Sequence, residues 1–169
     1  GECYASQHCF NRSANRGECA QFCRMSFNLL NADGTVLAKN KHLLSLRDMN
    51  RTTSVEDMML AGISSFKIEG RLKEVDYVKN VTAHYRRIID KIIAKHPEQF
   101  KRSSYGTSSI TFEPNVCKSF NRKFTNYFID GNRTEDLQNI DSPKSMGEKI
   151  GTIAAIDKRR QCFTINLLP

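Results

Sequence analysis

Cysteine thiols near the N-terminus are the side chains of this sequence whose type and spacing most directly indicate chemistry. Four cysteines, Cys3, Cys9, Cys19 and Cys23, follow the pattern C-x5-C-x9-C-x3-C. Thiolates that converge from a loop bind zinc or an iron–sulfur cluster, and the spacing alone does not distinguish the two. Such clustering favours a metal site in a reducing compartment over a disulfide scaffold. The alternative is that one or two of these cysteines, Cys9 above all, are free thiols.

A second group with chemical potential lies in the run Lys67-Ile-Glu-Gly-Arg71. It follows a predicted strand over 65–68, and in parallel α/β folds sites assemble where strands end and βα loops begin. We expect Arg71 to bind an anionic group and Glu69 to orient a ligand or act as a base, with Lys67 as a third catalytic candidate. The alternative is that Glu69 and Arg71 form a structural ion pair.

Basic and aromatic side chains alternate further along the chain. Lys118, Arg122 and Lys123 are interleaved with Phe120 and Phe124. This combination suits an RNA backbone with stacked bases, so the three basic residues are the nucleic-acid candidates. The alternative is that the aromatic side chains, at helical spacing, belong to the core.

The remaining reactive residue types indicate no further site. Motifs typical of metalloproteases, serine hydrolases and nucleotide-binding loops do not occur in the sequence. His84 and His96 fall within and at the end of a predicted helix, where structural roles are expected. Cys117 and Cys162 are expected to be buried small apolar side chains.

The elements that must position these residues alternate between strand and helix. The first 27 residues predict an irregular polar loop, and Asp33-Gly34 predicts a β-hairpin turn. The following elements are short strands over 42–46 and 65–68, a helix from Ser54 to Gly62 and a helix from Glu74 to Lys95. Strand–helix–strand–helix with short connections predicts an α/β fold with a parallel sheet.

Composition shifts divide the chain into three predicted regions. The small-residue stretch 103–109 is the clearest internal boundary. We assign the cysteine loop, hairpin and strand–helix units to 1–102, and a linker with the basic aromatic segment to 103–141. Two strands around the charged turn Asp157–Arg160 place the start of a small β domain at 142–169.

The charge balance indicates which classes of partner this protein is expected to bind. The 169 residues include 26 Lys and Arg against 18 Asp and Glu, a formal net charge of +8. This excess favours a polyanionic partner such as RNA, although a solvated basic surface explains it equally well. No apolar run has the roughly 20 residues of a membrane-spanning helix, and no signal peptide is evident, so we expect a cytoplasmic protein without a membrane partner.

Several motifs together resemble a known family. The runs Gly1–Ser6, Ser13–Arg24 and Ser65–Lys73 are similar to those of the collagenase-like peptidase family U-32. The runs Phe120–Thr125 and Asp141–Glu148 resemble the branch of that family that hydroxylates a cytidine of large-subunit ribosomal RNA.

The resemblance implies a fold and a cofactor. Members have a (β/α)8-type barrel followed by an extra β domain, so this chain would be the C-terminal part of the barrel and the start of the β domain. The family signature begins one cysteine before Gly1, so the chain looks like a fragment. Relatives hold a [4Fe–4S] cluster on four cysteines, with prephenate implicated as the hydroxylation donor. Cys3, Cys19 and Cys23 match cluster positions, and Arg16 and Arg24 of the same motif are assigned to cofactor binding.

Three functions follow from the resemblance and the residues. The first is an iron–sulfur-dependent hydroxylase of a ribosomal RNA cytidine, with the fragment expected to be inactive alone. The alternatives are a U-32 peptidase and a non-catalytic RNA-binding module. A truncated barrel would leave a sheet edge and helix residues such as Ile88, Ile89 and Ile92 uncovered, so the chain is expected to self-associate as a symmetric dimer.

Overall fold

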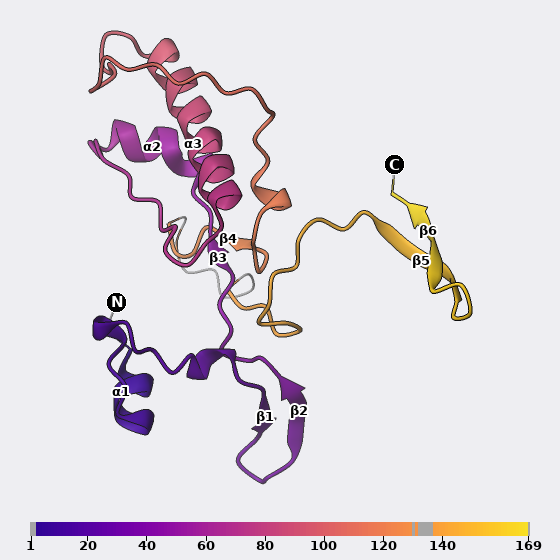
Figure 1. Cartoon of the computed structure of the whole chain (residues 1–169). Helices are drawn as coiled ribbons and strands as arrows, with labels where there is room; N and C mark the ends of the chain where they lie inside the picture. The colour runs from indigo at the N-terminus through magenta and orange to yellow at the C-terminus, as the bar shows by residue number, and fades with distance from the viewer. Residues whose placement is uncertain (1–2, 130, 132–136, 169) are drawn as a thin grey trace.

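The computed structural model describes residues 3–129, 131 and 137–168, and Figure 1 shows short elements joined by long connections. The helices are α1 (Tyr4–Phe10), α2 (Val55–Leu60) and α3 (Val75–Lys95). The strands are β1 (Phe27–Leu30), β2 (Val36–Lys41), β3 (Asp48–Met49), β4 (Phe124–Thr125), β5 (Gly151–Asp157) and β6 (Cys162–Leu167). Single 3-10 turns are η1 (Ala14–Arg16), η2 (Phe22–Arg24), η3 (Thr52–Ser54) and η4 (Val116–Lys118).

The packing of α2 against α3 forms the main apolar core. Val55 and Met59 of α2 meet Ile92 of α3, and all three side chains are buried. Partly buried side chains surround them: Phe66, Tyr85, Ile88, Ile89, Ile93 and Phe100. Both predicted helices are confirmed, because apolar residues at three- and four-residue steps place one stripe of α3 on α2.

Local signals end both helices where the sequence predicts. Gly62 follows α2 with a φ of +96°, a left-handed conformation that glycine adopts without strain. α3 ends at Lys95, and His96 and Pro97 follow it. There Glu56 of α2 accepts hydrogen bonds from Lys95 Nζ (2.6 Å) and His96 Nε2 (2.7 Å), which hold the pKa of Glu56 below its usual value.

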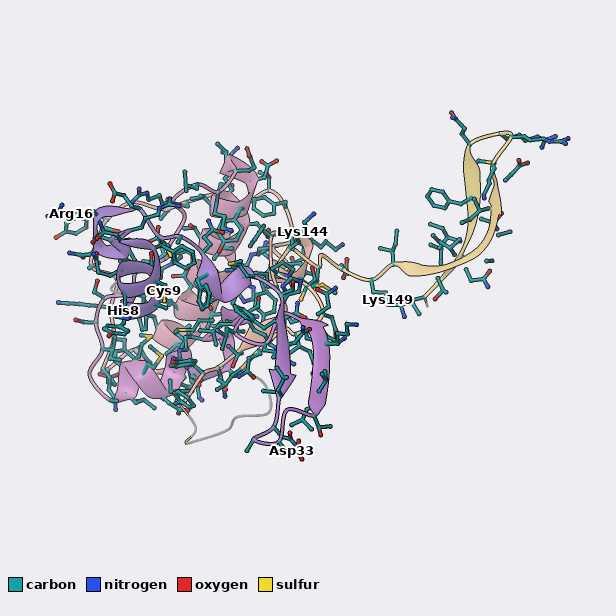
Figure 2. The ribbon with its side chains drawn as sticks, turned by 90° about the horizontal axis from the view of Figure 1, so that it is seen from below. His8, Cys9, Arg16, Asp33, Lys144 and Lys149 are labelled. Atoms are coloured by element: carbon teal, nitrogen blue, oxygen red, sulfur yellow. The ribbon has the colours of Figure 1, made fainter. Side chains whose placement is uncertain are left out.

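Two antiparallel hairpins are also confirmed. β1 and β2 pair around a turn in which the side chains of Asn31 and Asp33 both accept from the Thr35 N–H. β5 and β6 pair around the charged turn after Asp157. In Figure 2 the extended segment from Lys144 to Lys149 carries this second hairpin away from the rest of the chain.

The two predicted core strands are wrong. Residues 63–70 have no helix or strand, and of 42–46 only Leu46 forms a bridge, antiparallel to Gln138. The backbone of 42–47 bonds instead with 137–140, a segment nearly 100 positions away that no local pattern indicates. Within the described residues, β3 and β4 are the parallel pair, and each has two residues. The (β/α)8-type barrel stays a prediction.

Three local predictions are also corrected. The first 27 residues include a helix, α1, that begins where Cys3 Sγ accepts from the Ser6 N–H (3.5 Å). The aromatic residues from Phe120 onward, although at helical spacing, form no helix, because the left-handed φ values of Lys123 and Tyr127 (65° and 55°) interrupt any regular helix on both sides of β4. Cys117 and Cys162 are both exposed rather than buried, since Cys117 lies on the surface turn η4 and Cys162 begins β6 of the exposed second hairpin.

The surface that could drive self-association is not the helix surface that the sequence predicted. Ile92 is only 5% exposed, and Ile88 and Ile89 pack against it, so α3 is not the uncovered surface. The β5–β6 hairpin is uncovered instead. A bulge between Ile153 and Ala155 keeps Ile156 on the same face as Ile153. The exposed apolar side chains of this face are Ile153, Ile156, Phe163 and Leu167.

The boundaries of the three regions stay predictions, although 103–109 has no helix or strand and is exposed throughout. Among the described residues, none of the helices is both long enough and apolar enough to cross a bilayer.

We predict that Ile92→Ala lowers the free energy of unfolding by about 2–4 kcal/mol, because it opens a cavity at the α2–α3 contact. Ile150→Ala removes the same atoms from a side chain that is 61% exposed, and should cost less than about 0.5 kcal/mol. Urea denaturation of both variants measures the difference. Equal losses would contradict the assignment of the core.

We predict that the chain forms dimers through the apolar face of β5–β6, because a lone two-stranded hairpin is only marginally stable. The double change Ile156→Lys with Phe163→Lys should prevent dimer formation. Thr164→Lys adds charge to the opposite face and serves as the control. Light scattering over a concentration series measures the association, and a wild-type chain that stays monomeric would contradict the prediction.

Candidate functional site

The cysteine loop, residues 3–24, is held together by the buried hydroxyl of Ser6, which links α1 to the segment around Cys19. Ser6, which is fully buried, donates its Oγ–H to the Arg12 carbonyl (2.6 Å) and accepts from the Ala20 N–H (3.0 Å). Its own N–H bonds to Cys3 Sγ. Ser6 therefore holds the turn that begins at Cys3 beside the residue that follows Cys19.

The cysteines of this loop differ in exposure and contacts. Cys3 and Cys23 are half-buried, and Cys19 is exposed with its Sγ accepting from the Gln21 N–H (3.4 Å). Cys9 is exposed on α1, the helix that carries His8 (Figure 2). The thiols suit zinc or iron–sulfur in donor type. Among the described residues, no three His, Cys, Asp or Glu side chains are grouped so that they could hold a metal ion.

Arg71 lies against the cysteine loop. A Cβ at Gly17 would be 3.1 Å from Arg71 Nη2, and Gly17 has a φ of +83°. Only glycine suits this position, because a side chain would both strain the backbone and displace the guanidinium. The turn after residue 67 and the loop that carries Cys19 are thus brought together. Arg16, directly before Gly17, is exposed at the end of η1 (Figure 2).

Glu69 shapes the turn that carries Arg71. Its Oε1 accepts from the Arg71 backbone N–H (3.0 Å), and no side-chain ion pair joins these two described residues. Gly70 allows a close approach to α3, since a Cβ there would be 3.0 Å from Val78 Cγ2. Lys67 is exposed on the same turn.

Arg24 connects the cysteine loop to the middle of the chain. Its Nη1 donates to Ser45 Oγ (2.8 Å) and to the Leu46 carbonyl (2.7 Å). Burial and then the charge of Arg122 lower the pKa of Arg24, and Cys23, Asp48 and Cys19 oppose that shift. The guanidinium therefore lies within electrostatic range of both the thiols and Asp48.

Asp48 and Arg122 form a two-pronged ion pair at the end of β3. Asp48 Oδ2 accepts from the Arg122 backbone N–H (2.8 Å) and from Nε (3.1 Å), and Oδ1 accepts from Nη2. Arg122, a nucleic-acid candidate, is thus engaged within the protein. Lys73 Nζ lies 3.1 Å from the centre of the Phe120 ring, and Arg122 Cζ lies 5.4 Å from the same centre. Burial lowers the pKa of Lys73.

The other two nucleic-acid candidates point into solvent. Lys118 is exposed, with its Nζ 3.9 Å from Glu148, and Lys123 is exposed beside β4. Lys118 also lines an open groove of about 910 Å³ between α3 and residues 108–119, whose walls carry charges of both signs: Lys79, Arg86, Asp76 and Glu113.

The sequence did not single out Ser6, Asp48 or Lys73. The rule that selected Lys67–Arg71, a polar residue after a strand, would also have selected Asp48, which follows 42–46. Lys73 and Ser6 carry no such signal, because their importance depends on Phe120 and Ala20, which are remote in sequence.

Comparison with protein-family models matches residues 1–139 to peptidase family U32. The chain belongs to this family. The chain is 42% identical over 158 residues to the Escherichia coli 23S rRNA 5-hydroxycytidine C2501 synthase, covering 94% of the chain and 24% of the relative. A Porphyromonas gingivalis collagenase is 33% identical over 134 residues, covering 79% of the chain and 35% of the relative.

A third relative is named for tRNA hydroxylation. Bacillus subtilis tRNA hydroxylation protein P1 is 29% identical over 173 residues, covering 98% of the chain and 39% of the relative. The chain therefore spans well under half the length of each of these three proteins. No solved structure matches the chain significantly.

We predict that Ser6→Ala loosens the cysteine loop, because two backbone groups lose a buried partner at about 1–3 kcal/mol. Amide hydrogen exchange at Ala20, whose N–H donates to the Ser6 hydroxyl, should accelerate at least tenfold. Ser13→Ala, in the same loop at a position without a side-chain capping bond, is the control. Unchanged exchange at Ala20 in Ser6→Ala would contradict the role of the hydroxyl.

Proposed function

We propose that this chain is part of an iron–sulfur-dependent cytoplasmic enzyme that hydroxylates a cytidine of ribosomal RNA. One observation carries the proposal: the chain is 42% identical over 94% of its length to the rRNA 5-hydroxycytidine synthase, against 33% over 79% for the collagenase. The tRNA hydroxylation relative supports RNA as the substrate class. The proposal includes a (β/α)8-type barrel for the complete protein.

In this proposal the cysteine loop holds the cofactor. Cys3, Cys19 and Cys23 would supply three thiolate ligands, and a [4Fe–4S] cluster would supply one-electron chemistry. Arg24 lies within electrostatic range of two of these thiols, so its charge would stabilise their deprotonated, metal-binding form. Arg71, held over Gly17, would present a cation next to the loop, and prephenate is the proposed hydroxylation donor.

RNA would approach a chain with a surplus of positive charge. The formal net charge of +8 favours association with phosphates. Lys118 and Lys123 are exposed and would be able to reach the phosphate backbone of RNA, whereas Arg122 is held by Asp48. We therefore assign phosphate contact to the two lysines and a positioning role to Arg122.

Peptidase activity is the second candidate. Collagenase relatives favour it, and Thr52 Oγ1 lies 2.8 Å from His84 Nε2, a hydroxyl–imidazole pair. Burial lowers the pKa of His84, so its ring is neutral and able to accept a proton. The same hydrogen bond is also explained by a purely structural role, because it links η3 to α3.

We predict that Cys19→Ser, in the protein that carries this chain, abolishes the visible absorbance of the cluster, the bound iron and rRNA hydroxylation together. Cys162→Ser changes an exposed thiol outside the cysteine loop and should leave all three unchanged. Anaerobic spectroscopy, iron analysis and mass spectrometry of the rRNA measure the three properties.

The outcomes separate the candidate functions. Full hydroxylation by Cys19→Ser would refute the ligand role, and zinc in place of iron would refute the redox chemistry. Peptide cleavage that is lost in Thr52→Val but kept in Cys19→Ser would favour the peptidase.

A further inference from the structure

The connection from α3 to η4 contains backbone that pairs with nothing in the described part of the chain. Residues 107–112 form neither helix nor strand (Figure 1), and none of their N–H groups donates a hydrogen bond to a described residue. Among the bonds of the described residues, one carbonyl of this stretch accepts, that of Phe112 from Arg87 Nη2 (2.9 Å). The run Thr107-Ser-Ser-Ile-Thr-Phe112 is rich in the β-branched and aromatic residues that favour strands. Unpaired backbone of this composition is a template for one more strand.

Two contacts hold this connection beside α3. At one end Asn80 Nδ2 donates to the Asn115 carbonyl (2.6 Å), and Asn80 Oδ1 accepts from the Asn115 N–H (2.8 Å). At the other end Arg87 donates to the Phe112 carbonyl and pairs with Glu113. The α3 groove, the open space of about 910 Å³ between α3 and residues 108–119, lies along the same stretch. The unpaired backbone therefore forms one wall of a groove whose geometry is already fixed.

The walls of the α3 groove suit an apolar strand rather than a polyanion. Val78 and Ala83 of α3 line it together with Ile110 and Phe112 of the connection, and Phe112 is 43% exposed. The charges in the walls are of both signs, so they do not select a polyanion such as RNA. An occupant with an extended backbone would pair with 107–112 while its apolar side chains cover those of the walls.

The β5–β6 hairpin has the features of such an occupant. It is a two-stranded sheet whose outer edges have no partner among the described residues. One face exposes the apolar side chains of Ile153, Ile156, Phe163 and Leu167. Docking in the α3 groove would give this hairpin a third strand and cover its apolar face, which is what a lone hairpin lacks.

The hairpin is poorly placed to enter the groove of its own chain. Glu148 lies 3.9 Å from Lys118, a residue that lines the groove. The Leu168 N–H already bonds to the Ile150 carbonyl (3.0 Å), so Lys149 alone lies between the Glu148 contact and the paired hairpin. A tight reversal of the chain uses about two residues, usually Gly, Asn or Asp. The hairpin therefore leads away from its own chain (Figure 2) and is free to reach a neighbour.

We propose that the α3 groove is the docking site for the β5–β6 hairpin of a second copy of this chain, one strand of which pairs with residues 107–112. In a symmetric pair each hairpin occupies the groove of the other copy, so the assembly closes at two chains. The α3 groove, rather than a second hairpin, would thus receive the apolar face of β5–β6. Docking is independent of the proposed hydroxylation, because it requires neither a cofactor nor RNA.

Phe112→Lys tests the groove by sedimentation equilibrium of the full chain. The charge placed in the apolar wall should raise the dimer dissociation constant about tenfold or more. Tyr105→Lys makes the same kind of change in the same connection, at a fully exposed residue outside the groove, and should raise the constant less than about twofold. Two hairpins packed face to face would not involve Phe112, so equal effects of the two variants, or a wild-type chain that stays monomeric, would overturn the proposal.

Amide hydrogen exchange of the wild-type chain tests the backbone pairing without any variant. The amides of 108–111 have no partner within the described residues of a single chain. Above the dissociation constant, about two of them should exchange about tenfold more slowly than they do below it, because a strand pairs alternate amides. The amides of 103–106 lie outside the groove and should not change. Equal rates for 108–111 at both concentrations would overturn the proposal.

Photo-cross-linking identifies the occupant of the groove. A benzophenone amino acid replaces Phe112 in an equal mixture of isotopically light and heavy chains. It should cross-link to residues 151–168, and about half of the products should join a light chain to a heavy one, as expected for pairs formed at random. Products confined to single chains would show that the hairpin occupies its own groove, and products with any other segment would show a different occupant. Either result overturns the proposal.

Discussion

The ion pair between Asp48 and Arg122 is the interaction on which the central part of this chain depends. Two residues 74 positions apart are fixed by three hydrogen bonds, and the same contact places β3 beside β4. Both side chains are about three-quarters shielded from solvent. Loss of either partner would leave a partly buried charge without its counter-ion, which is costlier than the pair itself is stabilising.

The cysteine loop is joined to the middle of the chain by polar bonds rather than through the apolar core. The core lies between α2 and α3, whereas the loop reaches the centre through Arg24, which bonds to Ser45 and Leu46. Arg71 supplies a second contact at Gly17. Polar bonds of this kind fix geometry while contributing modest net stability. The segment that would hold a metal is thus positioned by charge and hydrogen bonding.

The sequence predicted the helices and hairpins that are specified by residues close to one another along the chain. Periodic apolar residues identified α3, Gly62 identified the end of α2, and turn residues identified both hairpins. It failed where partners are remote: the bonds of 42–47 go to 137–140, and α1 begins with an unusual sulfur cap. For the site, it named the thiols and Arg71. It could not name Ser6 or Lys73, whose roles depend on contacts with Ala20 and Phe120.

Charge interactions around Asp48 link the thiols with cations that are far from them in the sequence. Charge acts from Cys19 and Cys23 on Arg24, from Arg24 to Asp48, and from Asp48 to Lys73. In the proposed hydroxylase, this proximity would bring the cluster-binding thiols and the cations for an anionic reactant into one place. A peptidase would need a nucleophile exposed to a peptide, and the Thr52–His84 pair instead ties η3 to α3 in a partly buried position. The partly buried position of this pair therefore weakens the peptidase proposal relative to the hydroxylase proposal.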